Sequence, residues 1–127
     1  MGKIEEEQIL FIGGSRGFAS YHLLCRTIEL LRKWGILNKG PLHIVSGGAG
    51  GADTMAENYA KVNGYKFTKY PADWDRYGKK AGMLRNITMV DVSDIQLLFW
   101  DGVSKGTRHA ITYATKCNPK TTFTILY

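Results

Sequence analysis

The sequence lacks the features that mark several common classes of protein. It has only two cysteines, Cys25 and Cys117, and neither has a second Cys or a His at the spacing of a zinc site. We therefore expect no metal site, and we expect both cysteines to be buried free thiols within helices. No apolar run approaches the roughly 18–20 residues that span a bilayer, so no membrane segment or membrane partner is expected. The first seven residues, MGKIEEE, lack the apolar region of a secretion signal, which predicts a cytoplasmic protein.

The composition is that of one globular domain with a basic surface. Of the 127 residues, 44% are hydrophobic and 22% are charged, so we expect a single domain over residues 1–127. The formal charge of +6 comes from 17 Lys and Arg against 11 Asp and Glu, and it favours an anionic partner such as a nucleotide or nucleic acid. The basic residues are dispersed along the chain, so charge alone does not select nucleic acid.

Apolar runs of strand length alternate with segments of helical periodicity. Strands are predicted over 8–12, 42–45, 65–70, 95–100 and 121–126, and helices over 19–34, 54–63, from 83 and over 107–116. This alternation predicts an α/β fold, a single-domain Rossmann-like three-layer sandwich with a mostly parallel five-stranded sheet of order 3-2-1-4-5. In such sheets ligands bind beyond the carboxyl ends of the strands, at the point where the strand order reverses.

Three glycine-bearing loops follow strands at that edge, over residues 13–17, 46–53 and 101–107. Bare backbone with free N–H groups, near the positive end of a helix, suits an anionic group such as phosphate. Neither the P-loop motif nor a G-x-G-x-x-G motif is present, so the ordinary mononucleotide and dinucleotide sites are disfavoured. We predict an anion-binding cleft formed by the three loops together.

A fourth segment, residues 72–82, is polar, aromatic and bounded by glycine, and we expect it to be irregular. Two hypotheses remain open for it. It can form a lid in which Trp74 or Tyr77 stacks on a base, or it can be a surface loop anchored by one buried aromatic side chain.

The motifs Gly14-Ser15-Arg16, 46–53, Arg85-Asn86 and 99–107 occur in this order. The set resembles the SLOG superfamily, which joins the DNA-processing protein DprA/Smf to the Lonely Guy cytokinin-activating enzymes, and most of all its small YspA-like, YpsA-related domains. The resemblance runs from about Ile9 to Leu126. It implies a Rossmann-like fold that binds nucleotides or nucleotide-derived ligands through phosphate-binding loops, with no cofactor, and it makes a homo-oligomer unsurprising.

The resemblance, with the loops, implies a set of ligand-binding residues: Gly14, Ser15, Arg16, Ser46, Gly47, Gly48, Gly50, Gly51, Asp53, Arg85, Asn86, Asp101, Ser104, Gly106 and Thr107. Ser15 and Arg16 are expected beside the phosphate or sugar, and the glycines are expected to offer N–H groups. Asp53 can either cap the second helix by accepting its N–H groups or bind a ribose hydroxyl. Arg85 can face the ligand or be an ordinary surface arginine.

Catalysis is less well supported by the motifs than binding. Lonely Guy enzymes hydrolyse an N-glycosidic bond, and their pattern needs a Glu three residues after the Gly-Thr of the last loop. Here Gly106-Thr107 is followed by Arg108, His109 and Ala110, so alanine stands at the glutamate position. The candidate catalytic residues are therefore Arg85 and Asp101, and Asp101 has an alternative structural role in which it bonds loop N–H groups.

Three functions remain open at this point. A nucleotide-binding module that senses or sequesters its ligand fits the intact loops and the missing glutamate. A nucleotide hydrolase and a DprA-like single-stranded DNA binder are the alternatives.

Overall fold

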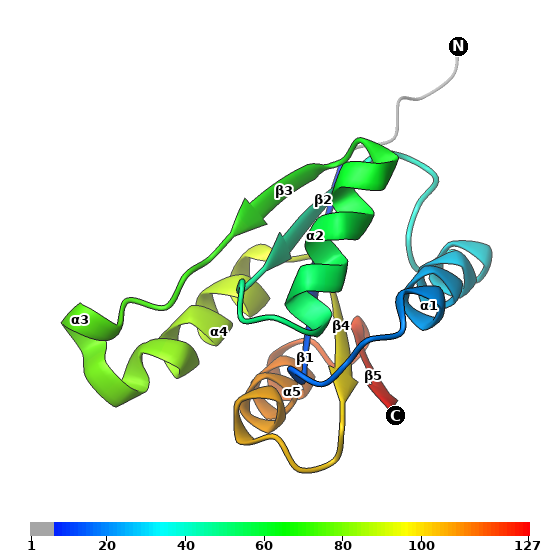
Figure 1. Cartoon of the computed structure of the whole chain (residues 1–127). Helices are drawn as coiled ribbons and strands as arrows, with labels where there is room; N and C mark the ends of the chain where they lie inside the picture. The colour runs from blue at the N-terminus through cyan, green and yellow to red at the C-terminus, as the bar shows by residue number, and fades with distance from the viewer. Residues whose placement is uncertain (1–6) are drawn as a thin grey trace.

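In the computed structural model of the chain, which describes residues 7–127, strands and helices alternate along the sequence (Figure 1). The elements are β1 (Gln8–Gly14), α1 (Tyr21–Lys33), β2 (Leu42–Ser46), α2 (Ala52–Asn63), β3 (Lys66–Lys69), α3 (Trp74–Tyr77), the 3₁₀ helix η1 (Gly78–Lys80), α4 (Ala81–Val92), β4 (Ile95–Trp100), α5 (Lys105–Cys117) and β5 (Thr122–Leu126). The prediction of a cytoplasmic protein rests on the segment MGKIEEE, most of which lies outside the described residues. No helix in residues 7–127 is both long and apolar enough to cross a bilayer.

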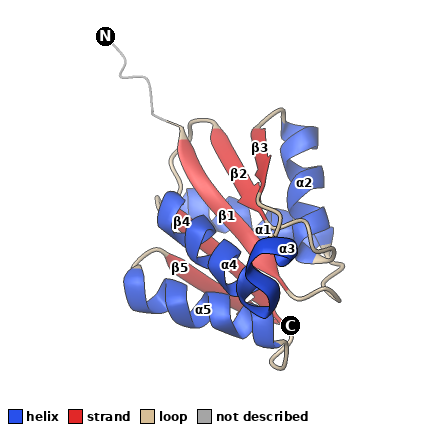
Figure 2. Ribbon diagram, turned by 90° about the vertical axis from the view of Figure 1, so that its left-hand side faces the viewer, coloured by secondary structure: helices blue, strands red, loops and turns tan. Residues whose placement is uncertain are grey.

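The sheet has five strands in the order β3-β2-β1-β4-β5, and every neighbouring pair is parallel. The predicted order 3-2-1-4-5 is confirmed. Helices α1 and α2 cover one face of the sheet, and α4 and α5 cover the other (Figure 2). Strands β2 and β3 lie on one side of β1, and β4 and β5 lie on its other side, so the strand order reverses between β1 and β4.

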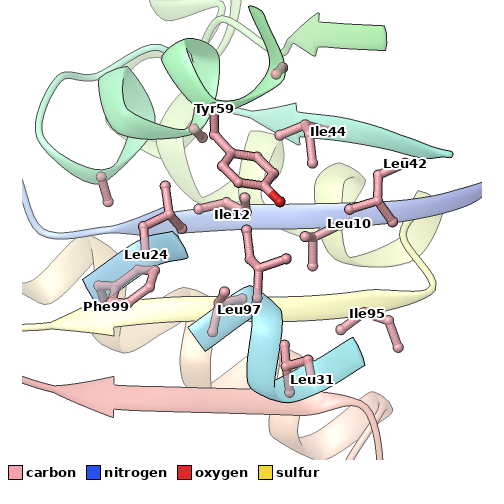
Figure 3. Close-up of a cluster of buried hydrophobic side chains, with 14 of the residues drawn as sticks. Leu10, Ile12, Leu24, Leu31, Leu42, Ile44, Tyr59, Ile95, Leu97 and Phe99 are labelled. Atoms are coloured by element: carbon pink, nitrogen blue, oxygen red, sulfur yellow. The ribbon is translucent and has the colours of Figure 1, made fainter. Parts of the chain in front are cut away.

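The central strands are buried on both faces, which explains their near-continuous apolar sequences. In β1, Leu10 and Ile12 face α1 and α2, and they belong to one core cluster with Leu24 of α1 and Leu97 of the neighbouring strand β4 (Figure 3). Phe11, between them, belongs to a second cluster on the α4 and α5 face. Alternate side chains of one strand therefore serve two cores, and the two helical layers are held to a shared sheet.

The segment 72–82, predicted to be irregular, is helical, so that prediction is wrong. Asp73 caps α3, because its Oδ1 accepts a hydrogen bond from the N–H of Arg76 at 3.2 Å. Gly78 follows with a φ of +57°, and the chain then enters η1 and α4. Figure 1 shows that α3 projects beyond the carboxyl end of β3.

Two smaller expectations also differ from the structure. The first helix starts at Tyr21 rather than residue 19, because the side chain of Ser20 accepts the N–H of Leu23 at 3.1 Å and caps it. Both cysteines were expected to be buried, but Cys25 is half-buried and Cys117, the last residue of α5, is exposed.

Candidate functional site

A cavity of about 540 Å³ lies at the carboxyl ends of β1 and β4, on the side of the sheet that α4 and α5 cover. Its volume is that of a typical small-molecule site. The position is the predicted one, where the strand order reverses. Its walls come from the loops after β1 and β4, from α3, η1 and α4, and from the first turn of α5.

The loop after β1 brings the two strand ends together. Gly14 has a φ of +152°, and a Cβ at this position would lie 2.2 Å from the carbonyl oxygen of Phe99, so a side chain does not fit. The N–H of Ser15 donates to the same oxygen at 2.9 Å, and its Oγ accepts the N–H of Asp101 at 3.1 Å. Buried Ser15 thus joins the two loops. Arg16, the next residue, is exposed and lines the cavity, and its guanidinium makes no hydrogen bond or ion pair among residues 7–127.

The glycine loop between β2 and α2 supports the cavity wall more than it lines it. Ala49 and Asp53 line the cavity, whereas the lining residues include none of the four glycines predicted to bind ligand, Gly47, Gly48, Gly50 and Gly51. The first amides of α2 are already used, because the N–H of Ala52 donates to Ser15 O at 3.4 Å and that of Asp53 to Gly50 O at 3.1 Å. Two of the amides at the N-terminus of α2 are therefore already bound within the protein, and anion binding by the glycines of this loop stays a prediction.

Ser46 and Asp53 form a buried pair behind that loop. Ser46 is fully buried and lies outside the cavity lining, and its Oγ is 2.5 Å from Ile12 O and 3.0 Å from Asp53 Oδ1. Asp53 Oδ2 accepts the N–H of Ala49 at 2.8 Å. Of the two roles open to Asp53, capping of α2 is not observed, because its carboxylate accepts the N–H of Ala49 in the preceding loop and α2 has no side-chain cap. Burial raises the pKa of Asp53, against the opposing effects of these hydrogen bonds and of the positive charges of Arg85 and Arg16.

Arg85 and Asn86, on α4, both line the cavity. A terminal nitrogen of Arg85, Nη1, donates to Gly47 O at 3.2 Å, while its Nε is buried without a partner in the described part of the chain. Burial also lowers the pKa of Arg85, which the negative charge of Asp53 partly offsets. Asn86 is buried, and its Nδ2 donates to Gly106 O at 3.3 Å, so α4 is tied to the first turn of α5. A buried N–H group without a partner is costly, so the Nε of Arg85 is an exception to the usual pairing of buried donors, on a residue that lines the cavity.

Asp101 organises the start of α5. Its Oδ1 accepts the N–H groups of Val103 and Ser104 at 2.9 and 2.8 Å, and its Oδ2 accepts the hydroxyl of Ser104 at 2.7 Å. The hydrogen bonds from Ser104, helped by Val103, lower the pKa of Asp101 to about 2. A carboxylate that is ionised and fully engaged is poorly suited to act as a general acid.

The first turn of α5 offers free donors to the cavity. The N–H groups of Lys105, Gly106 and Thr107 have no acceptor among the described residues, as expected for the first turn of a helix. Gly106 and Thr107 line the cavity with Ser104. The positive end of the α5 dipole therefore lies at the cavity, which Arg85 of α4 also lines.

Comparison with known proteins agrees with this geometry. A sequence model of the YspA, cpYpsA-related SLOG family matches residues 8–77, which is more than half of the chain. The chain belongs to this family. It is also 44% identical over 88 residues to the Gene 61 protein of Mycobacterium phage D29, an alignment that covers 63% of this chain and 70% of the phage protein. No solved structure matches the chain significantly.

In the SLOG fold of this chain, α3, η1 and the start of α4 bring three further side chains to the cavity: Trp74, which the sequence offered for stacking on a base, and Lys79 and Met83, which it did not offer. Trp74 and Tyr77 are 57% and 44% exposed, so the segment is not a loop anchored by a buried aromatic residue. The Asp73 cap was the signal in the sequence that could have placed a helix here.

At the position where Lonely Guy enzymes carry glutamate, the methyl group of Ala110 lines the cavity. The cavity is instead lined by three cationic side chains, Arg16, Lys79 and Arg85, and two carboxyls, Asp53 and Asp101. Within residues 7–127, no group of three or more His, Cys, Asp or Glu side chains is arranged to hold a metal ion.

Proposed function

We propose that the cavity binds a nucleotide or a nucleotide-derived ligand, and that the protein senses or sequesters it. One observation carries the proposal: the first turn of α5, with its free amides, lines the same cavity as Arg85 and Arg16. In the described chain, the buried Nε of Arg85 has no partner, and Arg16 makes no hydrogen bond or ion pair. A helix N-terminus with nearby guanidinium groups is a favourable place for phosphate. Membership of the SLOG family supports a nucleotide-related function.

The phosphate is placed at the first turn of α5 in this proposal. Gly106 and Thr107 donate their backbone N–H groups, and Arg16 and Arg85 reach the same anion from the opposite wall. Asp101 is ionised, and the N–H groups of its own loop and the Ser104 hydroxyl bind its carboxylate and partly offset its negative charge. The apolar part of the lining, which includes Phe11 and Leu98, is left for the less polar part of the ligand.

A hydrolase is the second candidate, and Asp53 is the observation that favours it. Burial raises the pKa of this cavity-lining carboxyl, and a carboxyl that keeps its proton can serve as a general acid. Incubation with nucleoside monophosphates, followed by analysis for released base and sugar phosphate, separates the two functions. Binding without turnover favours the module, and turnover that Asp53→Asn removes favours the hydrolase.

Arg16→Gln is the sharpest test of the binding site, because Arg16 is exposed and its guanidinium makes no contact that the fold needs. A nucleoside phosphate at 100 times its dissociation constant should raise the unfolding free energy of the wild type by about 2.7 kcal/mol. Arg16→Gln should weaken the affinity about 10-fold or more, since hydrogen bonds to charged groups contribute about 1.5–3 kcal/mol. Its melting temperature without ligand should not change.

Arg26→Gln is the matched control, since Arg26 is exposed on α1, on the other face of the sheet. It should bind like the wild type. The proposal fails if nucleoside monophosphates, diphosphates, NAD and cyclic dinucleotides all leave the wild-type melting temperature unchanged. It also fails if Arg16→Gln and Arg26→Gln bind equally well.

A further inference from the structure

The exposed indole of Trp74 is not explained by the fold. Trp74 is the first residue of α3, lines the cavity and leaves 57% of its surface open to solvent. Its ring has no aromatic or cationic partner, and its indole N–H has no acceptor, among residues 7–127. An indole carries a large apolar face and one donor, and both are usually satisfied where it does structural work.

The neighbouring Tyr77 differs from Trp74 in both respects. The guanidinium of Arg76 lies 5.2 Å from the centre of the Tyr77 ring, so this ring already has a cationic partner. Tyr77 lines a separate groove on α4, together with Tyr70 and Leu84, and does not line the main cavity. Of the two aromatic residues that the sequence offered for stacking, only Trp74 is placed for it.

The backbone around Trp74 is well defined by local contacts. The Asp73 cap and the bond from Tyr77 N to Asp73 O, 3.0 Å long, hold the single turn of α3. The indole lies against the start of α4, where a Cβ on Gly82 would be 3.4 Å from its Cη2 atom. The next residue, Met83, which is 48% exposed, lines the same cavity. The mouth of the cavity therefore presents a flat ring and a polarisable thioether to whatever enters.

We infer that Trp74 is the stacking platform for a planar heteroaromatic base, and that it makes the site selective for nucleotides over sugar phosphates. The inference rests on the proposed function, because the first turn of α5 and the arginines hold the phosphate. A base has a π-face that can stack on the exposed indole face, and such stacking tolerates any base. The cavity then has two ends, a cationic end for phosphate and an aromatic end for the base.

Ligand truncation tests the inference separately from the proposed function. Dissociation constants are measured by calorimetry for adenosine, guanosine, cytidine and uridine 5′-monophosphates and for ribose 5-phosphate, which lacks only the base. For the wild type, at least one nucleotide should bind more tightly than ribose 5-phosphate by about 5- to 150-fold, the usual range for stacking one base. Trp74→Ala should abolish this difference and leave the affinity for ribose 5-phosphate unchanged.

Two further variants complete the design. Trp74→Phe keeps a flat ring and should retain much of the difference, while Tyr77→Ala, on the same turn, should retain all of it. The inference is overturned if the difference survives in Trp74→Ala, if Tyr77→Ala removes it equally, or if ribose 5-phosphate binds the wild type as tightly as every nucleotide. In these outcomes phosphate binding stands. If neither ribose 5-phosphate nor any nucleotide binds, the proposed function fails, and this inference fails with it.

Discussion

Asp53→Asn should leave the protein as stable as the wild type, or more stable, at neutral pH. A hydroxyl has one proton, and the carbonyl of Ile12, 2.5 Å from Ser46 Oγ, can only accept it. The 3.0 Å contact between Ser46 Oγ and Asp53 Oδ1 then needs a second proton, which a protonated Asp53 supplies. An asparagine supplies it too, because its Nδ2 can donate to Ser46 while its Oδ1 accepts the N–H of Ala49.

The magnitude follows from the bonds that each substitution keeps. Asp53→Asn keeps the hydrogen bonds of this side chain with Ser46 and Ala49. At acid pH the unfolding free energy of this variant should therefore be lower than that of the wild type by no more than about 0.5 kcal/mol, which is within the range of one net hydrogen bond. Asp53→Ala leaves the N–H of Ala49 without its acceptor and opens a void, so it should cost about 1–3 kcal/mol at every pH. The pair of variants separates loss of charge from loss of hydrogen bonds.

The pH dependence has a definite sign. Burial raises the pKa of Asp53 above its ordinary value of 3.8, so the folded protein holds the proton more tightly than the unfolded chain does. The stability that this proton contributes is full below the unfolded pKa and is lost as the pH rises through the folded one. Wild type should therefore lose stability relative to Asp53→Asn as the pH rises from about 4.

Urea unfolding of wild type, Asp53→Asn and Asp53→Ala between pH 4 and 8 measures this difference. The reasoning is refuted if the wild type is more stable than Asp53→Asn at pH 7 and the advantage disappears on acidification. Asp53 would then be ionised in the folded state and held by Arg85 and Arg16. Asparagine at position 53 removes a carboxyl group from the cavity wall, so Asp53→Asn should bind phosphate no more weakly than the wild type.

The remaining predictions concern the loops and the alternative function. Gly51→Ala should cost several kcal/mol, because its Cβ would lie 2.3 Å from Arg16 O at a φ of +55°, whereas Gly35→Ala, at +77° with no atom within 4 Å, should cost only about 1–2 kcal/mol by urea unfolding. Asp101 has a lowered pKa, so its stabilising effect is present above the ordinary value of 3.8 and is lost as the pH falls toward about 2; Asp101→Asn should be less stable than the wild type at pH 7, and the two acid-unfolding curves should converge below pH 3. If the protein is a nucleotide module, a single-stranded oligonucleotide should bind weakly at 50 mM salt in fluorescence anisotropy, whereas tight binding that falls steeply with salt would favour the DprA-like alternative.

The sheet could be predicted from the sequence because its determinants are local and redundant. The central strands are apolar runs of the right length, the long helices have apolar periodicity, and alternation with right-handed crossovers leaves few strand orders. The segment around Trp74 was missed because its helix is one turn long and depends on a single cap, Asp73. A window of hydrophobic periodicity cannot detect an element of that length.

The sequence located the site, but it did not distinguish the loop whose N–H groups are free to bind a ligand from the loop that supports the cavity wall. Both glycine loops that precede a helix offered N–H groups, and nothing in their composition distinguishes them. The difference comes from how each loop folds: Ser15 O, from the loop after β1, and Gly50 O, from the glycine loop itself, accept the first two amides of α2, while those of α5 remain free. Likewise Ser46, a polar residue in a loop motif, is buried because Ile12 O lies close to it across the sheet.

The central claim is that the cavity binds a nucleotide by placing its phosphate at the start of α5. Titration of ¹⁵N-labelled protein with adenosine 5′-monophosphate tests it most directly, because the amides of Gly106 and Thr107 and the Nε–H of Arg85 each give a separate signal. The proposed geometry predicts saturable shifts of all three, larger than those of the Gly47, Gly48 and Gly50 amides, and the same shifts with ribose 5-phosphate. Saturable binding that leaves the α5 amides and Arg85 Nε unmoved, or the absence of any saturable shift, would contradict it.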